Sequence, residues 1–261
     1  MAKLLASPLL IGLASLAGKR WGPNVAGLMG GLPLVGGPVV LALWLSDGAG
    51  LAQQVALAAP AGIWANIVYM LVVGYASAHW RWYLVIPMGW ACYLAAALLI
   101  NAAGLAYSLT LGMAVLPGLW LAATRWLPRP AVSSVSVHLP RIELFTRMVA
   151  AALLVLSLTT ASSWIGPSLT GVLAGAPVAA VVIPAFTFAN AGRDALLHAL
   201  RGFLTGLMGF TVFFLILGNA MPALGAFALA PALIAGVGIG LLATWLSKPV
   251  LDLAPEQNLA P

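Results

Sequence analysis

The sequence predicts an all-α polytopic membrane protein with about nine transmembrane helices, arranged 5 + 4 in an inverted-topology repeat with interrupted helices 2 and 7. Three observations predict this fold class: an apolar composition, a series of long apolar runs, and a glycine pattern that recurs 144 residues later. Of the 261 residues, 63% are hydrophobic and only 6% are charged, and the mean hydropathy is +1.08. Soluble domains carry about 25% charged residues, so this composition indicates a membrane protein.

The scarce polar and sulfur-containing residues exclude several kinds of site. Cys92 is the single cysteine, so the chain can form neither an internal disulfide nor a multi-thiolate metal site. The three histidines show no zinc-ligand spacing, so we expect no metal and no cofactor. The net charge of +6 is spread between apolar segments, which indicates membrane topology signals and no nucleic-acid partner.

Nine apolar runs are long enough for a bilayer crossing, which takes about 17–25 residues. They cover residues 4–18, 23–46, 54–77, 82–101, 104–125, 144–162, 167–189, 202–220 and 223–246. The first run resembles a signal peptide, but its place in the repeat predicts that it is retained. Residues 222–247 are too few to cross twice, so we expect one crossing there, with a short re-entrant segment as the alternative.

The chain divides into two membrane-embedded halves joined by a polar connection. Residues 1–126 form the first transmembrane repeat with spans 1–5, and residues 144–247 form the second with spans 6–9. Residues 127–143 are rich in proline and serine and predict a cytoplasmic linker. Residues 248–261 form a polar C-terminal tail.

The basic residues predict the orientation in the membrane. With the N-terminus periplasmic and the C-terminus cytoplasmic, only Lys3 falls on the outer side. The cytoplasmic loops and their flanks then hold Lys19, Arg20, Arg81, Arg125, Arg129, Arg141, Arg147, Arg193, Arg201 and Lys248. Such a bias is the positive-inside rule. Several tryptophans, including Trp80, Trp82 and Trp126, lie near span ends, as interfacial anchors do.

Glycines reveal the internal repeat. With a shift of 144 residues, six glycine pairs coincide without a gap: Gly22/Gly166, Gly27/Gly171, Gly31/Gly175, Gly48/Gly192, Gly62/Gly206 and Gly74/Gly218. Glycine and proline record backbone shape, so the coincidence indicates a shared fold. The two units start five spans apart, an odd number, and therefore enter the membrane from opposite sides. That arrangement is an inverted-topology repeat, which many secondary transporters share.

Helix-breaking residues interrupt the same span in each half and predict the substrate site. The candidate substrate-binding residues there are Gly31, Pro33, Gly36, Gly37 and Pro38 in the first half and Gly175, Pro177 and Pro184 in the second. Unwound backbone at membrane depth is tolerated where it lines a cavity or is buried in protein. The alternative is a kinked helix whose small residues serve close packing.

Other polar residues complete the candidate site. Asn66 and Tyr69 lie three residues apart in mid-span, hence on one helix face, and offer an amide and a hydroxyl to a solute. Candidate gating or coupling residues lie at the ends of spans 2 and 7: Asp47, Asn190, Arg193, Asp194 and His198. The alternative for Asp47 is a helix-end residue in the headgroup layer, and for His198 it is a side chain that reaches the interface together with Arg201.

The stretch from Gly27 to Leu45, "GLMGGLPLVGGPVVLALWL", resembles a group of uncharacterised bacterial inner-membrane, permease-like proteins with GLPLTSGP-like segments. Val35-Gly36 stands where that segment has Thr-Ser, so the resemblance provides no hydroxyl ligand at the break. It implies a bacterial inner-membrane location and a permease-like protein, and it brings no known activity.

Together these patterns predict a secondary transporter, a permease or exporter, for a small polar or anionic solute. The alternatives are a channel, a non-catalytic membrane subunit that packs against a partner, and an intramembrane enzyme. The chain lacks a Walker A motif, and Glu143 and Glu256 lie outside the spans, so we do not expect an enzyme. The expected partners are the lipid bilayer and a small solute, with a second copy of the chain as a further candidate.

Overall fold

The structure is a computed structural model that describes residues 2–32, 40, 44–45, 48–131, 142–150, 152–153, 169, 172 and 178–251. The secondary-structure elements in these ranges are all helical, so the all-α part of the prediction is confirmed. The elements are α1 (Ala2–Trp21), α2 (Pro23–Gly31), α4 (Ala49–Ala76), α5 (Trp82–Ala102), α6 (Leu109–Leu121), the π-helix η1 (Ala122–Trp126), α8 (Val178–Leu224), the 3-10 helix η2 (Gly225–Ala228) and α9 (Leu229–Leu251). Residues 142–150 form a further short helix.

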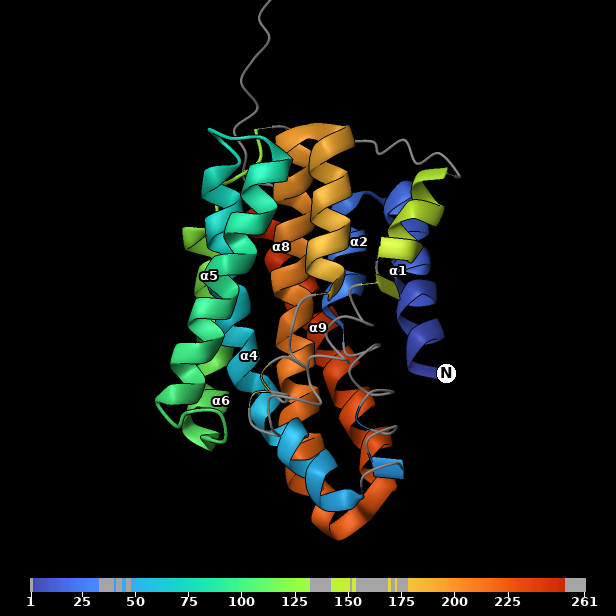
Figure 1. The fold of residues 1–261 in the computed structure, drawn as a ribbon, viewed down its shortest axis with the longest axis vertical. Coiled ribbons are helices and arrows are strands. Elements are labelled where there is room, and N and C mark those ends of the chain that lie inside the picture. Colours follow the sequence, from blue (N-terminus) through green and yellow to red (C-terminus); the bar gives the residue numbers. More distant parts are fainter. Residues whose placement is uncertain are drawn as a thin grey trace, which may run out of the picture.

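Helix α8 is the centre of the bundle and is sharply kinked. Gly192 has φ 80° and ψ −173°, a backbone conformation that favours glycine, and it separates a short first arm from a long second arm. After η2, α9 returns beside the second arm in the opposite direction (Figure 1). The largest buried side chains of this arm include Phe213 and Phe214, whose rings pack edge to face with centroids 5.0 Å apart.

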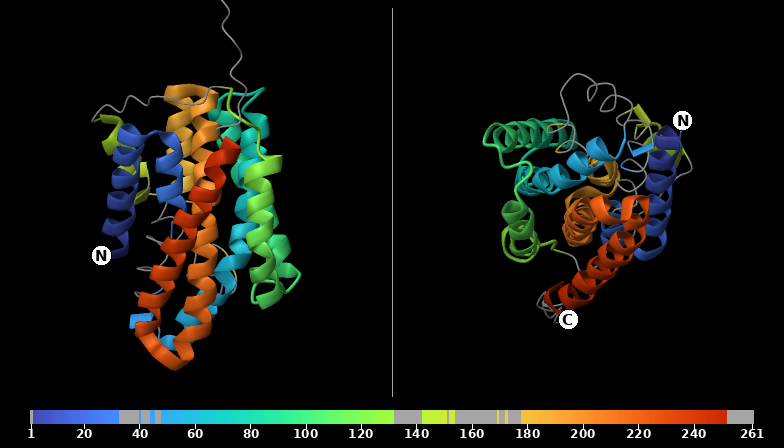
Figure 2. Two further views of the ribbon diagram at one scale, coloured as in Figure 1. Left: turned by 180° about the vertical axis from the view of Figure 1, so that it is seen from behind. Right: turned by 90° about the horizontal axis from the view of Figure 1, so that it is seen from below.

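The other helices surround the second arm of α8. Helix α2 packs against it, α1 packs against α2, and α4 packs on another side of α8. Helix α5 lies against α4, and α6 contacts both α4 and α8 (Figures 1 and 2). The core therefore lies where α2, α4 and α9 pack against the second arm of α8.

Glycines bring α2 and α8 together without intervening side chains. Gly31 and Gly206 face each other, Gly27 faces the backbone of α8, and Gly202 faces Asn24 of α2. Each helix therefore presents a pair of glycines four residues apart. A Cβ atom built on Gly31 would lie 2.5 Å from the carbonyl oxygen of Phe203, and one on Gly27 would collide with the carbonyl of Ala199. Small residues at this spacing allow close helix contact in membrane proteins.

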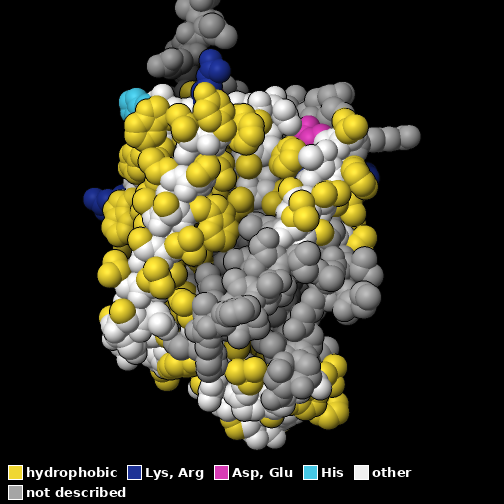
Figure 3. All heavy atoms as spheres, viewed as in Figure 1, with side chains coloured by type: hydrophobic (Ala, Val, Ile, Leu, Met, Phe, Trp, Pro, Cys, Tyr) yellow, Lys and Arg dark blue, Asp and Glu magenta, His cyan; other side chains and the backbone are white. Residues whose placement is uncertain are grey.

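The outer surface of the described helices is strongly apolar. Large side chains that are about half exposed or more occur on α1, α5, α6 and α9, among them Leu13, Leu98, Leu99, Met113, Ile234 and Trp245. Figure 3 shows hydrophobic side chains over much of the described surface, whereas charged and histidine side chains lie only in the upper half of that view. Soluble monomers rarely expose so much contiguous apolar surface, so the fold is consistent with a membrane protein.

The prediction of about nine transmembrane helices is wrong. Three helical stretches in the described ranges are long and apolar enough to cross a membrane: Ala49–Ala76, Trp82–Ala102 and Val181–Leu246. Apolar length overestimated the number because α2 has only nine residues and α6 only 13. The expected eighth and ninth runs both lie within the third stretch, as the second arm of α8 and the antiparallel helix α9, which η2 joins. The 5 + 4 inverted arrangement depended on that number and falls with it.

The predicted interruption of the seventh span near Gly175–Pro184 is also wrong for the described part of that range, from Val178 onward. Pro184 lies within the first arm of α8, which is helical from Val178 onward, and its side chain is buried. A proline inside a membrane helix is tolerated where neighbouring groups satisfy the freed carbonyl. The break in α8 occurs instead eight residues later, at Gly192.

Candidate functional site

Helix α2 ends inside the protein, where the first interruption was predicted. It starts after Gly22, which has φ 93°, and stops at Gly31. Leu32 then leaves the helix with an extended backbone (φ −74°, ψ 156°), and its N–H donates to the carbonyls of Leu28 and Met29. Nine residues span about 13.5 Å, less than half of the roughly 30 Å hydrocarbon core. Leu32 is only 9% exposed, so this helix end is enclosed by protein.

Many of the predicted site residues lie outside the described part of the chain. These are Pro33, Gly36, Gly37, Pro38, Asp47, Gly175 and Pro177. Gly31 is described, and it contacts the backbone of Phe203 and Gly206 on α8. Its role in the structure is therefore close packing, which the sequence left open as the alternative.

Asn66 and Tyr69 lie on α4, and both side chains are completely buried. They share a face of this 28-residue helix, as their spacing predicts. Helix α5 approaches that face closely, because a Cβ atom built on Gly89 would lie 2.9 Å from the ring of Tyr69. The two polar groups thus point into the protein interior and away from lipid.

Tyr93, which the sequence did not single out, belongs to the same region. It lies one turn after Gly89 on α5, is completely buried, and packs edge to face on Trp90 with centroids 5.3 Å apart. Its hydroxyl donates to the carbonyl of Val172 at 3.2 Å. Val172 belongs to the second glycine- and proline-rich segment, so Tyr93 links α5 to that segment. The only sequence signal was a tyrosine in an apolar run, as for Tyr69.

Four of the five predicted gating residues, Asn190, Arg193, Asp194 and His198, lie near the kink of α8. They are on a different helix from Asn66 and Tyr69. Asn190 is exposed, and Arg193 and His198 are half-buried. The Nε atom of Arg193 is buried and has no hydrogen-bond partner among the described residues. A carboxylate oxygen of Asp194 accepts a hydrogen bond from the N–H of Ala131 at 3.1 Å. This contact ties α8 to the start of the predicted linker.

Arg201 fixes the same connection more firmly. Its guanidinium donates to the carbonyls of Ala123 at 2.7 Å, Leu127 at 2.6 Å and Pro128 at 3.3 Å. Arg201 is only 5% exposed, so the expectation that it reaches toward the membrane interface is wrong. It satisfies carbonyls at the C-terminal end of η1, where helices leave acceptors unpaired.

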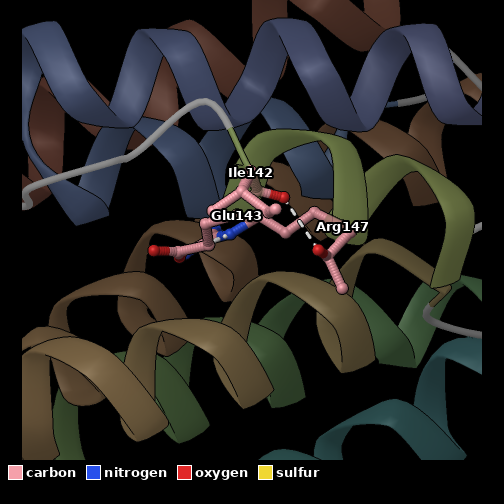
Figure 4. Close-up of polar contacts among 4 residues, drawn as sticks. Ile142, Glu143 and Arg147 are labelled. Carbon is pink, nitrogen blue, oxygen red and sulfur yellow. Dashed lines mark hydrogen bonds and ion pairs between the residues drawn. The ribbon is translucent and has the colours of Figure 1, made fainter.

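A buried ion pair lies next to α8 in the helix of residues 142–150 (Figure 4). Arg147 Nη2 is 2.6 Å from Glu143 Oε1, and the two side chains are 3% and 8% exposed. The guanidinium also lies 5.4 Å from the ring centre of Phe186 on the first arm of α8. The sequence placed both residues at the cytoplasmic surface and did not predict their burial.

One hollow among the described residues is apolar and dry. It lies between α8, η2 and α9, is lined by apolar residues such as Val40, Trp44 and Leu217, and has no space for a water molecule. No group of three His, Cys, Asp or Glu side chains in the described ranges could hold a metal ion.

No model of a known protein family matches this chain, and searches of curated proteins and of solved structures also found no match.

Proposed function

We propose that this chain is an integral protein of the bacterial inner membrane and a secondary transporter, a permease or exporter, for a small polar or anionic solute. The solute would bind where α2 ends. The single observation that supports this proposal is that α2 stops after nine residues inside the bundle, with Leu32 buried and extended.

A helix that ends at membrane depth leaves carbonyl groups that need partners. Each unsatisfied backbone group in hydrocarbon costs several kcal/mol, so such ends occur where protein or a solute pathway surrounds them. Transporters use discontinuous helices in this way, and their substrate and ion sites lie near the bilayer midplane. The last carbonyls of α2 would accept hydrogen bonds from a polar solute or coordinate a coupling cation.

The distribution of basic residues supports a cytoplasmic location for one end of the bundle. Arg125 lies in η1. The hydroxyl of Tyr75 at the end of α4 donates to the carbonyl of Trp126 in η1. On α8 near its kink, Arg201 donates to the carbonyl of Leu127, and Asp194 accepts from the N–H of Ala131. Arg81 follows the end of α4, so these basic residues share one end. Under the positive-inside rule that end faces the cytoplasm.

A second candidate function is a non-catalytic membrane subunit that packs against a partner. The observation in its favour is the glycine contact between α2 and α8, since the glycines of α2 face backbone and no cavity. Cysteine labelling separates the two functions. The single natural cysteine, Cys92, is first replaced by alanine, and Leu32→Cys is introduced into that background.

Right-side-out and inside-out vesicles are treated with a cationic, membrane-impermeant methanethiosulfonate reagent. A transporter that alternates between two open states exposes Leu32→Cys to the reagent from both sides. Leu98→Cys on the apolar surface of α5 should react from neither side, and Arg125→Cys should react only in inside-out vesicles. If Leu32→Cys reacts from neither side while Arg125→Cys reacts as expected, the transporter proposal fails and the packing subunit is favoured.

A further inference from the structure

We propose that one end of the α4, α5 and η1 helices binds the headgroup of an anionic phospholipid. The surface consists of exposed arginines and aromatic side chains: Arg81, Arg125, Arg129, Tyr75, Trp82 and Trp126. We call it the arginine–aromatic surface. It is separate from the buried residues around the end of α2.

The aromatic side chains of this surface are unusually exposed for such large groups. Tyr75 is 59% exposed, Trp126 47% and Trp82 46%. The hydroxyl of Tyr75 donates to the carbonyl of Trp126 at 2.7 Å, so the end of α4 and η1 lie in direct contact. Arg125 precedes Trp126 and Arg81 precedes Trp82, and both arginines are exposed. Each tryptophan therefore has a cationic neighbour in the chain at the same end of the bundle.

The order of side chains along two helices matches the order of groups in a phospholipid. On α5, Arg81 is followed by exposed Trp82 and Tyr83 and then, further along, by exposed Leu94 and Leu98. At a rise of about 1.5 Å per residue, position 98 lies about 25 Å from position 81 along the helix. This distance is at least as long as the acyl-chain layer of one membrane leaflet is thick. The phosphate would thus contact the arginine, the glycerol would contact the aromatic side chains, and the acyl chain would contact the leucines.

Helices α6 and η1 repeat this order with the opposite chain direction. Exposed Leu109 and Met113 come first, then exposed Trp120 and Trp126, and Arg129 lies beyond the end of η1. Tryptophan and tyrosine prefer the headgroup level, and clustered arginines there attract anionic lipids. A soluble protein partner would not account for leucines exposed along the full length of α5.

Charge complementarity favours an anionic lipid over a zwitterionic one. The two acidic residues within the described ranges are engaged elsewhere, Glu143 with Arg147 and Asp194 with the N–H of Ala131. The exposed arginines therefore have no ion-pair partner among the described residues. A guanidinium matches phosphate oxygens in geometry as well as charge.

This inference rests on the membrane location in the proposed function and not on transport. The test uses full-length protein in nanodiscs with equal amounts of phosphatidylglycerol and phosphatidylcholine. Lipids that stay bound after release are counted by native mass spectrometry. We expect at least about a threefold excess of phosphatidylglycerol, since one arginine near an anionic surface contributes roughly fivefold before screening.

The variant Arg81→Gln with Arg125→Gln should reduce this excess markedly, with Arg129 as the remaining cation of the surface. The matched control, Lys19→Gln with Arg20→Gln, removes the same amount of charge from the end of α1. This control variant should retain the excess of phosphatidylglycerol. Equal retention of both lipids by the wild type, or equal loss in both variants, would overturn the proposal. Carbonate washing of membranes tests the location separately, because a protein that is washed off contradicts the membrane assignment itself.

Discussion

Arg201 Nη2 of α8 lies 2.6 Å from the carbonyl oxygen of Leu127, at the point where η1 gives way to the connection between the halves of the chain. Two further bonds from the same guanidinium reach Ala123 and Pro128. One buried side chain therefore donates hydrogen bonds to the carbonyls of three residues. Its removal leaves these three carbonyls, which are buried or partly buried, without that donor.

Arg201→Met should destabilise the protein by at least about 1–3 kcal/mol, the usual cost of one buried polar group left without a partner. The stability of Arg201→Lys should lie between that of the wild type and that of Arg201→Met, because an ammonium group cannot reproduce the fixed fork of donors of a guanidinium. Thermal unfolding in detergent measures both. Arg125→Met is the control, since Arg125 is exposed and should tolerate the change. Equal midpoints for Arg201→Met and wild type would contradict this structural role.

Gly206→Ala should weaken the contact between α2 and α8. The new Cβ atom would collide with the carbonyl of Leu28 and lie 2.8 Å from the Cα of Gly31. Overpacking of this kind costs about 1–3 kcal/mol. Gly238→Ala on α9 is the matched control because nothing lies within 4 Å of the new atom. It should be neutral or slightly stabilising, since alanine has the higher helix propensity. The reverse order of unfolding midpoints would show that α2 does not pack as described.

Glu143→Gln should be strongly destabilising, because it leaves the guanidinium of Arg147 buried without its counter-ion. Breaking a buried pair from one side costs about 3–5 kcal/mol, whereas replacing both partners with apolar residues is often neutral. The double variant Glu143→Met with Arg147→Met should therefore recover much of the lost stability. Chemical denaturation followed by tryptophan fluorescence gives the comparison. A double variant no better than Glu143→Gln would mean that the two residues do not act as a pair.

Tyr93→Phe should cost about 1 kcal/mol, the net value of one buried hydrogen bond. The change removes only the hydroxyl that donates to the carbonyl of Val172 and keeps the ring in place. Tyr83→Phe on the same helix is the control, because Tyr83 is 50% exposed. Hydrogen exchange around residue 172 should rise in Tyr93→Phe alone. Unchanged exchange in both variants would argue against a link between α5 and this segment.

The sequence predicted that Asn66 and Tyr69 share one helix face, and both side chains are buried on α4. Their role as a solute site stays a prediction. Tyr93 escaped prediction because its partner is distant in the chain. Glu143 and Arg147 have the i,i+4 spacing of a helical ion pair, but their burial depends on packing against α8 and could not be predicted. Val172 is 79 residues from Tyr93, and no local pattern marks a contact of that range.

By itself the sequence determined the helical, apolar character of the chain and the positions where the backbone needs glycine. Gly22, Gly48 and Gly192 all have positive φ, and each stands directly before a helical segment, because only glycine adopts that conformation without strain. The tertiary structure alone decided how apolar segments become helices. It ended α2 after nine residues, folded α9 back along α8 after η2, and turned Gly31 toward Gly206. The physical reason is that the length of an apolar run shows only whether the segment could lie in a membrane. Where a helix ends and which helices pack closely depend on the neighbouring groups that bond each carbonyl and fill each space.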